Sequence, residues 1–341
     1  MSTINDVARA AGVSVSTVSR ALRGLDRVSP QTRARVAQAA SELRYVASPT
    51  ASSLASGRTK AVAVVVPFLT RWFFATLIGG IEQALRRHDH HVLLIALEGE
   101  SFGTRLRLSH NMLWKRVDGV IVLATPLDEQ EQAVIDRLGL PVVTSGNRIR
   151  DWSCVRIDDK EAMRTAVGHV LDLGHTDIAY VGGVPDASAY VQTPQDRAWA
   201  FANALAERGL RCPPEWVVES DWTAAGAARD IMPVLNGPSR PTAVVAASDE
   251  MALGVLGAAR RSGLAVPEDL SVIGVDDYVL SEALDLTTVR QDVLCQGRRT
   301  GEALMRQLMG DGPAAVDEVM PVQLVVRGST APPQQTRGTN T

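Results

Sequence analysis

The sequence predicts an α/β protein with two unequal parts: an all-α helix-turn-helix headpiece at the N-terminus and a body of two doubly wound parallel-sheet subdomains. Two observations indicate this fold. Three amphipathic segments with good helix caps fill residues 1–46, and continuous apolar segments alternate with amphipathic ones from residue 60 onward. Apolar strands that alternate with helices are typical of parallel sheets covered on both faces. The length of the second part suits two such sheets.

The charge of the chain divides at the same place as the secondary-structure pattern. Residues 1–60 hold nine basic and three acidic side chains, a net charge of +6, and the rest of the 341-residue chain carries −9. A cationic module beside an anionic body is suited to docking on phosphates through the small part alone. The distribution therefore favours a nucleic-acid partner for the headpiece.

Composition argues against membrane, secreted and metal-binding classes. The longest apolar stretch, Ala61–Leu69, is far shorter than the roughly 20 residues needed to cross a bilayer. The chain also lacks the basic-then-apolar start of a signal peptide. Cys154, Cys212 and Cys295 are widely spaced, which predicts neither a disulfide framework nor a thiolate metal site. We expect a cytoplasmic protein with no membrane partner, no metal and no cofactor.

A first helix is predicted over Ile4–Ala11. Thr3 and Asp6 have the spacing of a capping box, in which each side chain accepts a hydrogen bond from the other residue's backbone N–H. Gly12 then supplies the left-handed conformation that commonly ends a helix. A tight turn therefore follows the first helix directly.

A second helix is predicted over Val15–Leu22, with Ser14 as its cap. Its apolar positions are predicted to face inward, namely Val18, Ala21 and Leu22. Its small polar and basic positions are left outside, namely Ser16, Thr17, Ser19 and Arg20. Two short helices around a glycine-containing turn form a helix-turn-helix, whose second helix can enter the major groove of DNA.

A third helix is predicted to close the miniature core. Ser29 is a good cap and Pro30 is favoured at the first helical position. Apolar residues then recur at helical spacing, namely Val36, Ala39, Ala40 and Leu43. The alternative is that all three helices belong to a larger bundle and that the arginines are merely solvated.

The body alternates strands and helices from residue 60 onward. The predicted buried strands are Ala61–Pro67, Val92–Leu97, Gly119–Leu123, Pro141–Thr144, Ile178–Val181, Ala243–Ala246 and Ser271–Val275. The helices predicted between them are Phe74–Arg87, Lys160–Leu173, Asp196–Arg208 and Glu250–Ser262. Ligands of such sheets bind beyond the carboxyl ends of the strands.

The body carries no convincing enzyme signature. The patterns G-x-x-x-x-G-K-[ST], G-x-G-x-x-G and G-x-S-x-G are absent from the sequence, which removes the usual phosphate cradles and the nucleophile elbow. Gly182-Gly183 follows a predicted strand but is too short a motif to indicate a nucleotide. No catalytic residue is therefore assigned.

The headpiece resembles the LacI/GalR family of bacterial regulators nearly residue for residue. The matching positions are 3–8, 11–14, 16–22, 28–29, 32–33 and 43–45. The resemblance implies that Val15 and Ser16 face base edges, that Arg20 contributes further along the groove, and that hydroxyl side chains contact phosphates. The DNA-binding set that it implies is Thr3, Ser14, Val15, Ser16, Thr17, Ser19, Arg20, Arg23, Ser29, Thr32 and Leu54.

A hinge is predicted over residues 47–59. The stretch TASSLASG at 50–57 is small and polar around Leu54, and a helix there would be marginal alone. In the family, the two hinge helices of a dimer enter the minor groove and a leucine wedges between bases, a role that the resemblance implies for Leu54. The sequence departs from the family at Ala47-Ser48 and Ser52, where Pro-Asn and Arg are usual. A flexible linker is the alternative.

The rest of the chain, to about Thr330, also resembles this family. The landmarks are Trp72-Phe73-Phe74, Gly80-Ile81-Glu82, 116–121, His169, 173–175, 248–252, 266–269, 272–277 and 286–289. The resemblance implies the fold of periplasmic sugar-binding proteins, with two subdomains joined by three crossings and an effector in the cleft. The first subdomain is expected at about 60–158 and 287–318, the second at about 159–286 and 319–330, and a disordered tail at 331–341.

The resemblance also implies an effector site in the cleft. Its expected members are Phe73 and Phe74 in one wall, Arg197 as a bidentate fork, Trp222 as a stacking aromatic, Ser248 where Asn is commoner, and Asp276 as an acceptor. Aromatic faces, an Arg fork and a carboxylate suit a sugar, which offers apolar faces and hydroxyl edges. The alternatives are that the aromatics are ordinary core and that Arg197 and Asp276 form salt bridges or caps.

The function implied by the resemblance is a repressor of sugar-utilisation genes. A homodimer would bind a palindromic operator, and a sugar effector would release it. A corepressor acts through the same linkage with the opposite sign and stays open. The alternatives from other classes are a sugar-metabolising enzyme with an appended DNA-binding domain and a pure solute-binding protein. The polar tail after Gly328 has no leucine heptads, which favours a dimer over a tetramer.

Overall fold

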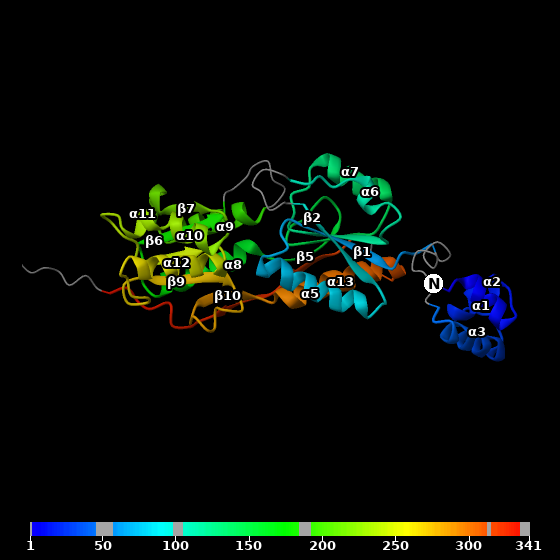
Figure 1. The fold of residues 1–341 in the computed structure, drawn as a ribbon. Coiled ribbons are helices and arrows are strands. Elements are labelled where there is room, and N and C mark those ends of the chain that lie inside the picture. The colour runs from blue at the N-terminus through cyan, green and yellow to red at the C-terminus, as the bar shows by residue number, and fades with distance from the viewer. Residues whose placement is uncertain (1, 46–56, 98–104, 184–191, 312–314, 335–341) are drawn as a thin grey trace, which may run out of the picture. The chain divides into compact units, whose positions relative to one another are not determined.

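The computed structural model of the protein describes residues 2–45, 57–97, 105–183, 192–311 and 315–334. The chain divides into two compact units, residues 1–60 and 61–341. The first is the headpiece and the second is the core (Figure 1). None of the helices in these described ranges is long and apolar enough to span a lipid bilayer.

The headpiece is a three-helix unit around a small apolar core. Its helices are α1 (Ile4–Ala11), α2 (Val15–Leu22) and α3 (Pro30–Glu42). Thr3 and Asp6 form the predicted capping box, and Gly12 ends α1 in the left-handed conformation at φ 64°. The buried side chains are Val7, Ala8, Ala11, Val18, Ala21, Val36, Ala39 and Ala40. The helix-turn-helix prediction is confirmed.

One inward position predicted for α2 is wrong. Leu22 is 39% exposed, whereas Val18 is fully buried. Leu22 is the last residue of α2, and Val18 and Ala21 are the residues of α2 that the small core encloses. The apolar pattern of α2 therefore extends one residue beyond the part of the helix that packs against the headpiece core.

The first sheet of the core is wholly parallel in its described strands. Its order is β11-β5-β4-β3-β1-β2. These strands are β1 (Ala61–Val66), β2 (His91–Ala96), β3 (Gly119–Leu123), β4 (Val142–Ser145), β5 (Ser153–Ile157) and β11 (Asp317–Met320). Alternate residues of β1 pack on opposite sides. Val64 joins the cluster of α5 (Trp72–Arg86) and α13 (Val293–Met309), and Val65 joins that of α6 (His110–Leu113) and α7 (Glu129–Leu138).

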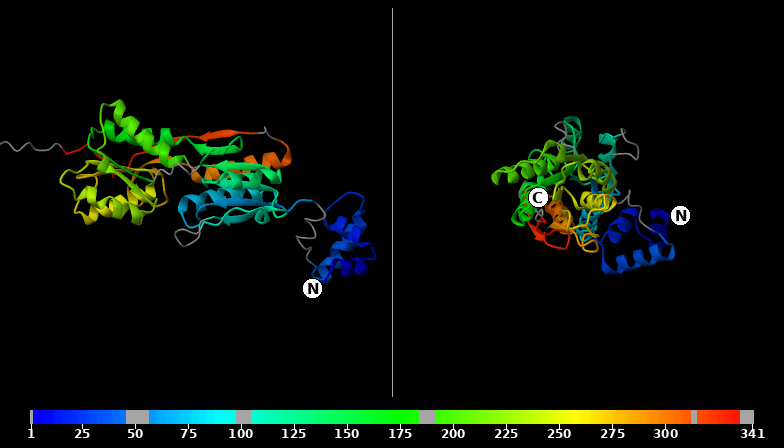
Figure 2. Two further views of the ribbon diagram at one scale, coloured as in Figure 1. Left: turned by 90° about the horizontal axis from the view of Figure 1, so that it is seen from above. Right: turned by 90° about the vertical axis from the view of Figure 1, so that its left-hand side faces the viewer.

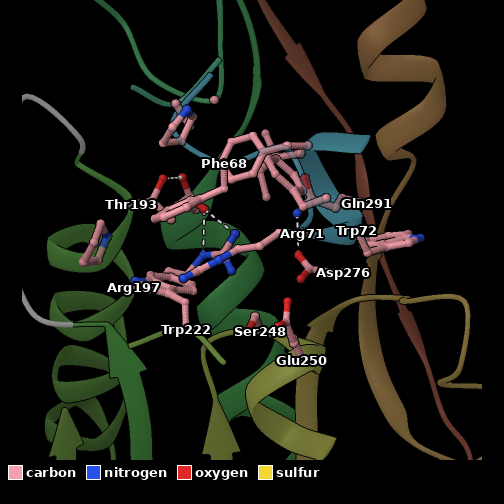
Figure 3. A pocket seen from close by; sticks show the side chains of 18 of the residues that line it. Phe68, Arg71, Trp72, Thr193, Arg197, Trp222, Ser248, Glu250, Asp276 and Gln291 are labelled. Atoms are coloured by element: carbon pink, nitrogen blue, oxygen red, sulfur yellow. Dashed lines mark hydrogen bonds and ion pairs between the residues drawn. The ribbon is translucent and has the colours of Figure 1, made fainter. Parts of the chain in front are cut away.

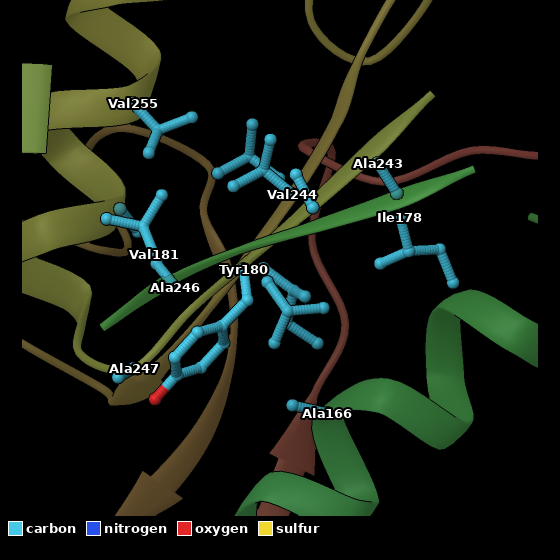
Figure 4. Packing of buried hydrophobic residues seen from close by; sticks show 14 of the residues in the cluster. Ala166, Ile178, Tyr180, Val181, Ala243, Val244, Ala246, Ala247 and Val255 are labelled. Carbon is cyan, nitrogen blue, oxygen red and sulfur yellow. The ribbon is translucent and has the colours of Figure 1, made fainter. Parts of the chain in front are cut away.

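The second sheet is parallel except at one edge. Its order is β12-β10-β9-β8-β6-β7, and β12 runs antiparallel to β10. These strands are β6 (Ile178–Gly183), β7 (Val217–Ser220), β8 (Ala243–Ala246), β9 (Ser271–Asp276), β10 (Thr287–Gln291) and β12 (Val322–Val325). The α-helices around it are α8 (Asp159–Asp172), α9 (Thr193–Glu207), α10 (Ala224–Asp230), α11 (Met232–Leu235) and α12 (Asp249–Arg261). Figure 4 shows Val255 of α12 and Ala166 of α8 on opposite sides of the strands.

The chain crosses between the two sheets three times, and Figure 2 shows the two subdomains that these crossings connect. The chain passes from β5 to α8, from β10 to α13, and from β11 to β12. The expected return to the first subdomain at Thr287 is wrong, because β10 pairs with β9 and β12 in the second sheet. Its β-branched start, Thr287-Thr288-Val289, is fully buried there. The crossing therefore follows Gln291.

Helices α5 and α13 touch backbone to backbone. A Cβ on Gly80 would lie 2.2 Å from the carbonyl oxygen of Leu294, and a Cβ on Gly297 would lie 2.2 Å from that of Leu77. Any side chain at either glycine would force the helices apart. This contact fixes α5, whose first turn carries Phe73 and Phe74.

The expected boundary of the tail at residue 331 is wrong. Ala331 donates its N–H to Ser271 Oγ at 3.0 Å, and its carbonyl oxygen lies 2.8 Å from His175 Nε2. These contacts attach Ala331 to the second subdomain. Residues 335–341 of the expected tail lie outside the described residues.

Candidate functional site

The outer side of α2 presents the residues predicted to read DNA. Ser16, Arg20 and Arg23 are exposed, and Thr17 and Ser19 are half-buried. Val15 is 39% exposed at the first position of the helix. An apolar side chain among hydroxyl and guanidinium donors can contact a thymine methyl while its neighbours donate to base edges. The exposed side of α2 therefore offers the kinds of side chain that a recognition helix uses, and its contacts with bases stay a prediction.

Two of the serines predicted to bind DNA, Ser14 and Ser29, also cap helices. Ser14 Oγ accepts a hydrogen bond from the Thr17 N–H at 3.2 Å, and Ser29 Oγ accepts one from the Thr32 N–H at 3.2 Å. The first turns of α2 and α3 contain no acidic residue. Helix N-termini of this kind attract anions through their free N–H groups. Thr3 also caps a helix, α1, but the first turn of that helix contains an acidic residue, Asp6. The Thr3 hydroxyl donates to the Asp6 carboxylate at 2.8 Å.

The predicted hinge wedge cannot be placed. Leu54, together with Ala47, Ser48 and Ser52, lies outside the described residues. Its role in the minor groove stays a prediction from the sequence.

All six predicted effector-site residues line one cavity of the core, of about 280 Å³. They are Phe73, Phe74, Arg197, Trp222, Ser248 and Asp276. Figure 3 shows four of them, Arg197, Trp222, Ser248 and Asp276, around the same space. The cavity lies where the strands of both sheets end, for example at Pro67 after β1, Trp222 after β7 and Asp276 at the end of β9. This is the position in which open α/β sheets bind ligands.

Arg197 lines the cavity but is already engaged with the protein. Its Nε and Nη2 atoms lie 2.7 Å from Asp159 Oδ1, and Nη1 donates to the Ala247 carbonyl. Burial would lower the pKa of Arg197, but the charges of Asp159 and Asp276 raise it above its usual value. The bidentate contact to ligand expected of Arg197 therefore stays a prediction, and it can use only the N–H groups that these protein contacts leave. An Arg side chain has five N–H groups, so two remain for a ligand.

Trp222 owes its position to two backbone features. It has a left-handed φ of 64°, which turns the chain sharply after β7. Its indole fills the space above Gly183, where an added Cβ would lie 1.9 Å from the Trp222 Nε1 atom. The Arg197 guanidinium lies 6.0 Å from the centre of the Trp222 ring. The Gly182-Gly183 pair thus makes room for aromatic side chains.

Asp276 ends β9 as a buried acceptor. Gln291 donates to its Oδ1 atom at 2.6 Å. Burial raises the pKa of Asp276 to about 7, against the opposing effects of Arg197 and of the Gln291 hydrogen bond. Ser248 caps α12 by accepting a hydrogen bond from the Met251 N–H at 3.2 Å, which leaves its own O–H available as a donor.

The structure adds lining residues that the sequence analysis did not identify. They include Phe68, Arg71, Trp72, Asp159, Thr193, Glu250, Tyr278, Gln291 and Gln296. Two of them make contacts across the cleft. Arg71 of the first subdomain donates to the Asp221 carbonyl oxygen at 3.0 Å, and Trp72 packs edge-on against Tyr278 with ring centres 5.1 Å apart. These contacts join guanidinium and aromatic groups of the two subdomains at the cavity.

A buried carboxylate supports the wall that carries Tyr278. Asp249 accepts hydrogen bonds from the Tyr278 N–H at 2.9 Å and from the Ser281 and Thr288 hydroxyls at 2.6 Å. Burial raises the pKa of Asp249, and these hydrogen bonds oppose the rise. Asp249 thereby ties the start of α12 to the loop between β9 and β10.

Comparison with known proteins identifies both parts of the chain. Residues 3–48 match the family model described as bacterial regulatory proteins, lacI family, and residues 167–330 match a periplasmic binding protein-like domain. The HTH-type transcriptional repressor CytR of Escherichia coli (strain K12) is 32% identical over 335 residues, which cover 96% of each chain. The chain belongs to the LacI family of bacterial regulatory proteins.

Two solved structures share the fold over nearly the whole chain. A Lac repressor dimer bound to operator and the anti-inducer ONPF has a TM-score of 0.85 and 28% identity, and the match covers 97% of this chain and 99% of that chain. The complex of the transcriptional regulator CelR with cellobiose has a TM-score of 0.71 and 30% identity, with 96% and 100% covered. The predicted fold class is confirmed, and LacI-family membership makes the chain a DNA-binding transcriptional regulator and not an enzyme.

Proposed function

We propose that this LacI-family regulator is a cytoplasmic homodimeric repressor of sugar-utilisation genes. Two headpieces bind a palindromic operator, and a sugar bound in the core cavity releases them. The observation that carries the proposal is the gathering of Phe73, Arg197, Trp222 and Asp276 from both subdomains around one cavity. A ligand bound between two subdomains can change how the subdomains are arranged relative to each other. In a dimer, that change can alter the spacing of the two headpieces and so their affinity for the operator.

A direct test is a titration of operator DNA at fixed salt. Footprinting of genomic fragments first identifies the protected palindrome, and fragments carrying it are then titrated with and without candidate sugars. We expect a sugar to weaken operator binding by a factor of about 5–150, the usual range of allosteric coupling. A sugar that tightens operator binding would show that the ligand is a corepressor and not an inducer. Absence of any symmetric protected sequence would contradict the proposal.

Trp222→Ala is expected to separate effector binding from DNA binding. Removal of the indole takes away the largest aromatic surface in the second subdomain wall, so sugar affinity should fall at least tenfold. Operator affinity without sugar should stay within about twofold, because Trp222 belongs to the core and not to the headpiece. Calorimetry with the sugar that releases the operator measures sugar affinity, and titration of operator DNA measures operator affinity. Trp199→Ala is a matched control, since Trp199 is 54% exposed and does not line the cavity.

Sugar affinity is expected to rise with pH through about 7. Burial raises the pKa of Asp276 to about 7, and hydroxyl donors bind the ionised carboxylate better than the protonated one. A bound sugar therefore lowers this pKa, and affinity follows the ionised fraction, increasing up to about tenfold between pH 6 and 8. Calorimetric titration across this range measures the effect. Asp276→Asn should bind weakly and without this pH dependence.

Dimer formation is supported by exposed apolar side chains in one loop. Val279, Leu280 and Leu284 are 67%, 44% and 50% exposed, and neighbouring exposed apolar groups mark association surfaces. We expect sedimentation equilibrium to give a dimer for the full chain. Leu280→Asp should shift the equilibrium toward monomer, whereas the same change at exposed Leu94 on β2 serves as a comparison. A stable tetramer would contradict this prediction.

A further inference from the structure

The charges around the cavity restrict the chemical class of effector it can hold. We infer that the cavity takes an uncharged polyhydroxyl ligand and discriminates against phosphorylated or carboxylated sugars. This inference rests on the proposed function, which assigns a sugar to the cavity. Among the described lining residues the ionisable groups that carry charge are Arg71, Asp159, Arg197, Glu250 and Asp276, two cationic and three acidic.

The deeper cation is neutralised by its own ion pair. Arg197 is 4% exposed, and two of its nitrogens lie 2.7 Å from Asp159 Oδ1. Thr193 donates to the other Asp159 oxygen at 3.0 Å. The two N–H groups that Arg197 keeps can donate to a hydroxyl oxygen. Its positive charge, however, is matched by the Asp159 carboxylate and is not free to balance an anion.

The second cation is held at the other wall. Arg71 donates to the Asp221 carbonyl oxygen at 3.0 Å, and its guanidinium carbon lies 4.1 Å from the centre of the Phe68 ring. Burial raises the pKa of Glu250, and the charge of Arg71 opposes that rise. Hydrogen bonds from Thr223, together with the charges of Arg229 and Arg71, outweigh burial and lower the pKa of Asp221. Arg71 thus has acidic neighbours before any ligand arrives.

Acceptors remain available in the cavity wall. The Gln296 Oε1 atom is buried and has no hydrogen-bond partner among the described residues, while its Nε2 atom donates to Ser145 Oγ at 3.1 Å. Gln291 donates to Asp276 Oδ1, and Asp276 Oδ2 and the Glu250 carboxylate are further acceptors in the cavity wall. Hydroxyl groups donate to such acceptors. The wall therefore favours a ligand rich in O–H donors.

An anionic group on the same ligand would meet these acceptors without a counter-ion. Like charges in a site removed from water repel far more strongly than in bulk solvent. A phosphate or carboxylate facing Glu250 or Asp276 would either repel them or force them to take up a proton. We expect at least a tenfold loss of affinity for the anionic form of a sugar relative to its neutral form.

The experiment compares matched sugars on the full chain. For each aldohexose or disaccharide, the neutral sugar, its 6-phosphate and its uronic acid are titrated by calorimetry at pH 7.5, and operator release is measured in parallel. Wild type is compared with Glu250→Gln, which removes one acidic group from the wall. Glu82→Gln is the matched control, because it changes the net charge equally at a half-exposed position on α5 outside the cavity.

The expected result is binding and operator release by a neutral sugar, with its phosphate and uronate at least tenfold weaker. Glu250→Gln should reduce this ratio several-fold, and Glu82→Gln should leave it unchanged. An anionic sugar that binds as tightly as its neutral counterpart, or more tightly, would overturn the inference while leaving the proposed function standing. If no sugar in any form binds or releases operator, the proposed sugar effector itself fails, and the inference fails with it.

Discussion

Replacing Asp159 by alanine is expected to lower the free energy of unfolding of the core by about 3–5 kcal/mol. The side chains of Asp159 and Arg197 are only 10% and 5% exposed. Removal of the carboxylate leaves a guanidinium that is buried, charged and deprived of its partner. It also removes the acceptor for the Thr193 hydroxyl. Denaturant unfolding of the full chain, followed by circular dichroism, measures the loss.

An exposed ion pair provides the control for this prediction. Arg208 and Asp172 lie 2.8 Å apart, but their side chains are 55% and 71% exposed. Solvent screens such a pair, so Asp172→Ala should cost less than about 1 kcal/mol. If Asp159→Ala and Asp172→Ala lowered the free energy of unfolding by similar amounts, the burial of the Asp159–Arg197 pair would not explain its contribution to stability. Sugar binding should be lost only in Asp159→Ala, because Arg197 would no longer be held at the cavity wall.

The sequence predicts best those strands that are buried on both faces. Strands β1, β3 and β8 are continuous apolar runs, and every described residue of β3 and β8 is buried. Such runs have few other interpretations in an α/β chain. The strands that were not predicted lack this signal. β7 and β11 lie at sheet edges and alternate between exposed and more buried residues.

Two further strands were not predicted because their polar residues are buried by contacts distant in sequence. In β10, Thr287 is fully buried, and its hydroxyl contacts the Arg327 carbonyl oxygen and the Thr330 hydroxyl, both at 3.0 Å. In β5, Ser153 is buried and accepts from the Gln307 side chain at 2.7 Å. Local sequence contains no sign of such partners, because each lies at least 40 residues away.

In the candidate site too, residues in recognisable motifs were predicted, whereas residues placed by contacts distant in sequence were missed. The six lining residues were predicted through family resemblance, and the structure brings all of them to one cavity. Asp159 was missed because it follows a strand that was not predicted and meets Arg197 from 38 residues away. Arg71 was missed because its acceptor is 150 residues distant. A motif identifies a side chain, but only the fold shows which of its hydrogen bonds are already used.

Val18→Asp is expected to unfold the headpiece and to leave the core intact. Val18 is fully buried in a core of eight side chains, five of which are alanines. A carboxylate placed there without a partner costs several kcal/mol. A unit of about 45 residues with one small core seldom has more than about 3–5 kcal/mol to lose. Operator affinity should therefore fall at least 100-fold.

The effect on the core distinguishes an unfolded headpiece from a general loss of stability. The two units are compact bodies in their own right, so the core of Val18→Asp should unfold at the wild-type denaturant concentration and bind sugar normally. Ala37→Asp adds the same charge at an exposed position of α3, and it should weaken operator binding far less. If Val18→Asp also lowered the stability of the core, the headpiece would have to contribute to core folding. The assignment of DNA binding to the headpiece and of ligand binding to an independently folded core would then be wrong.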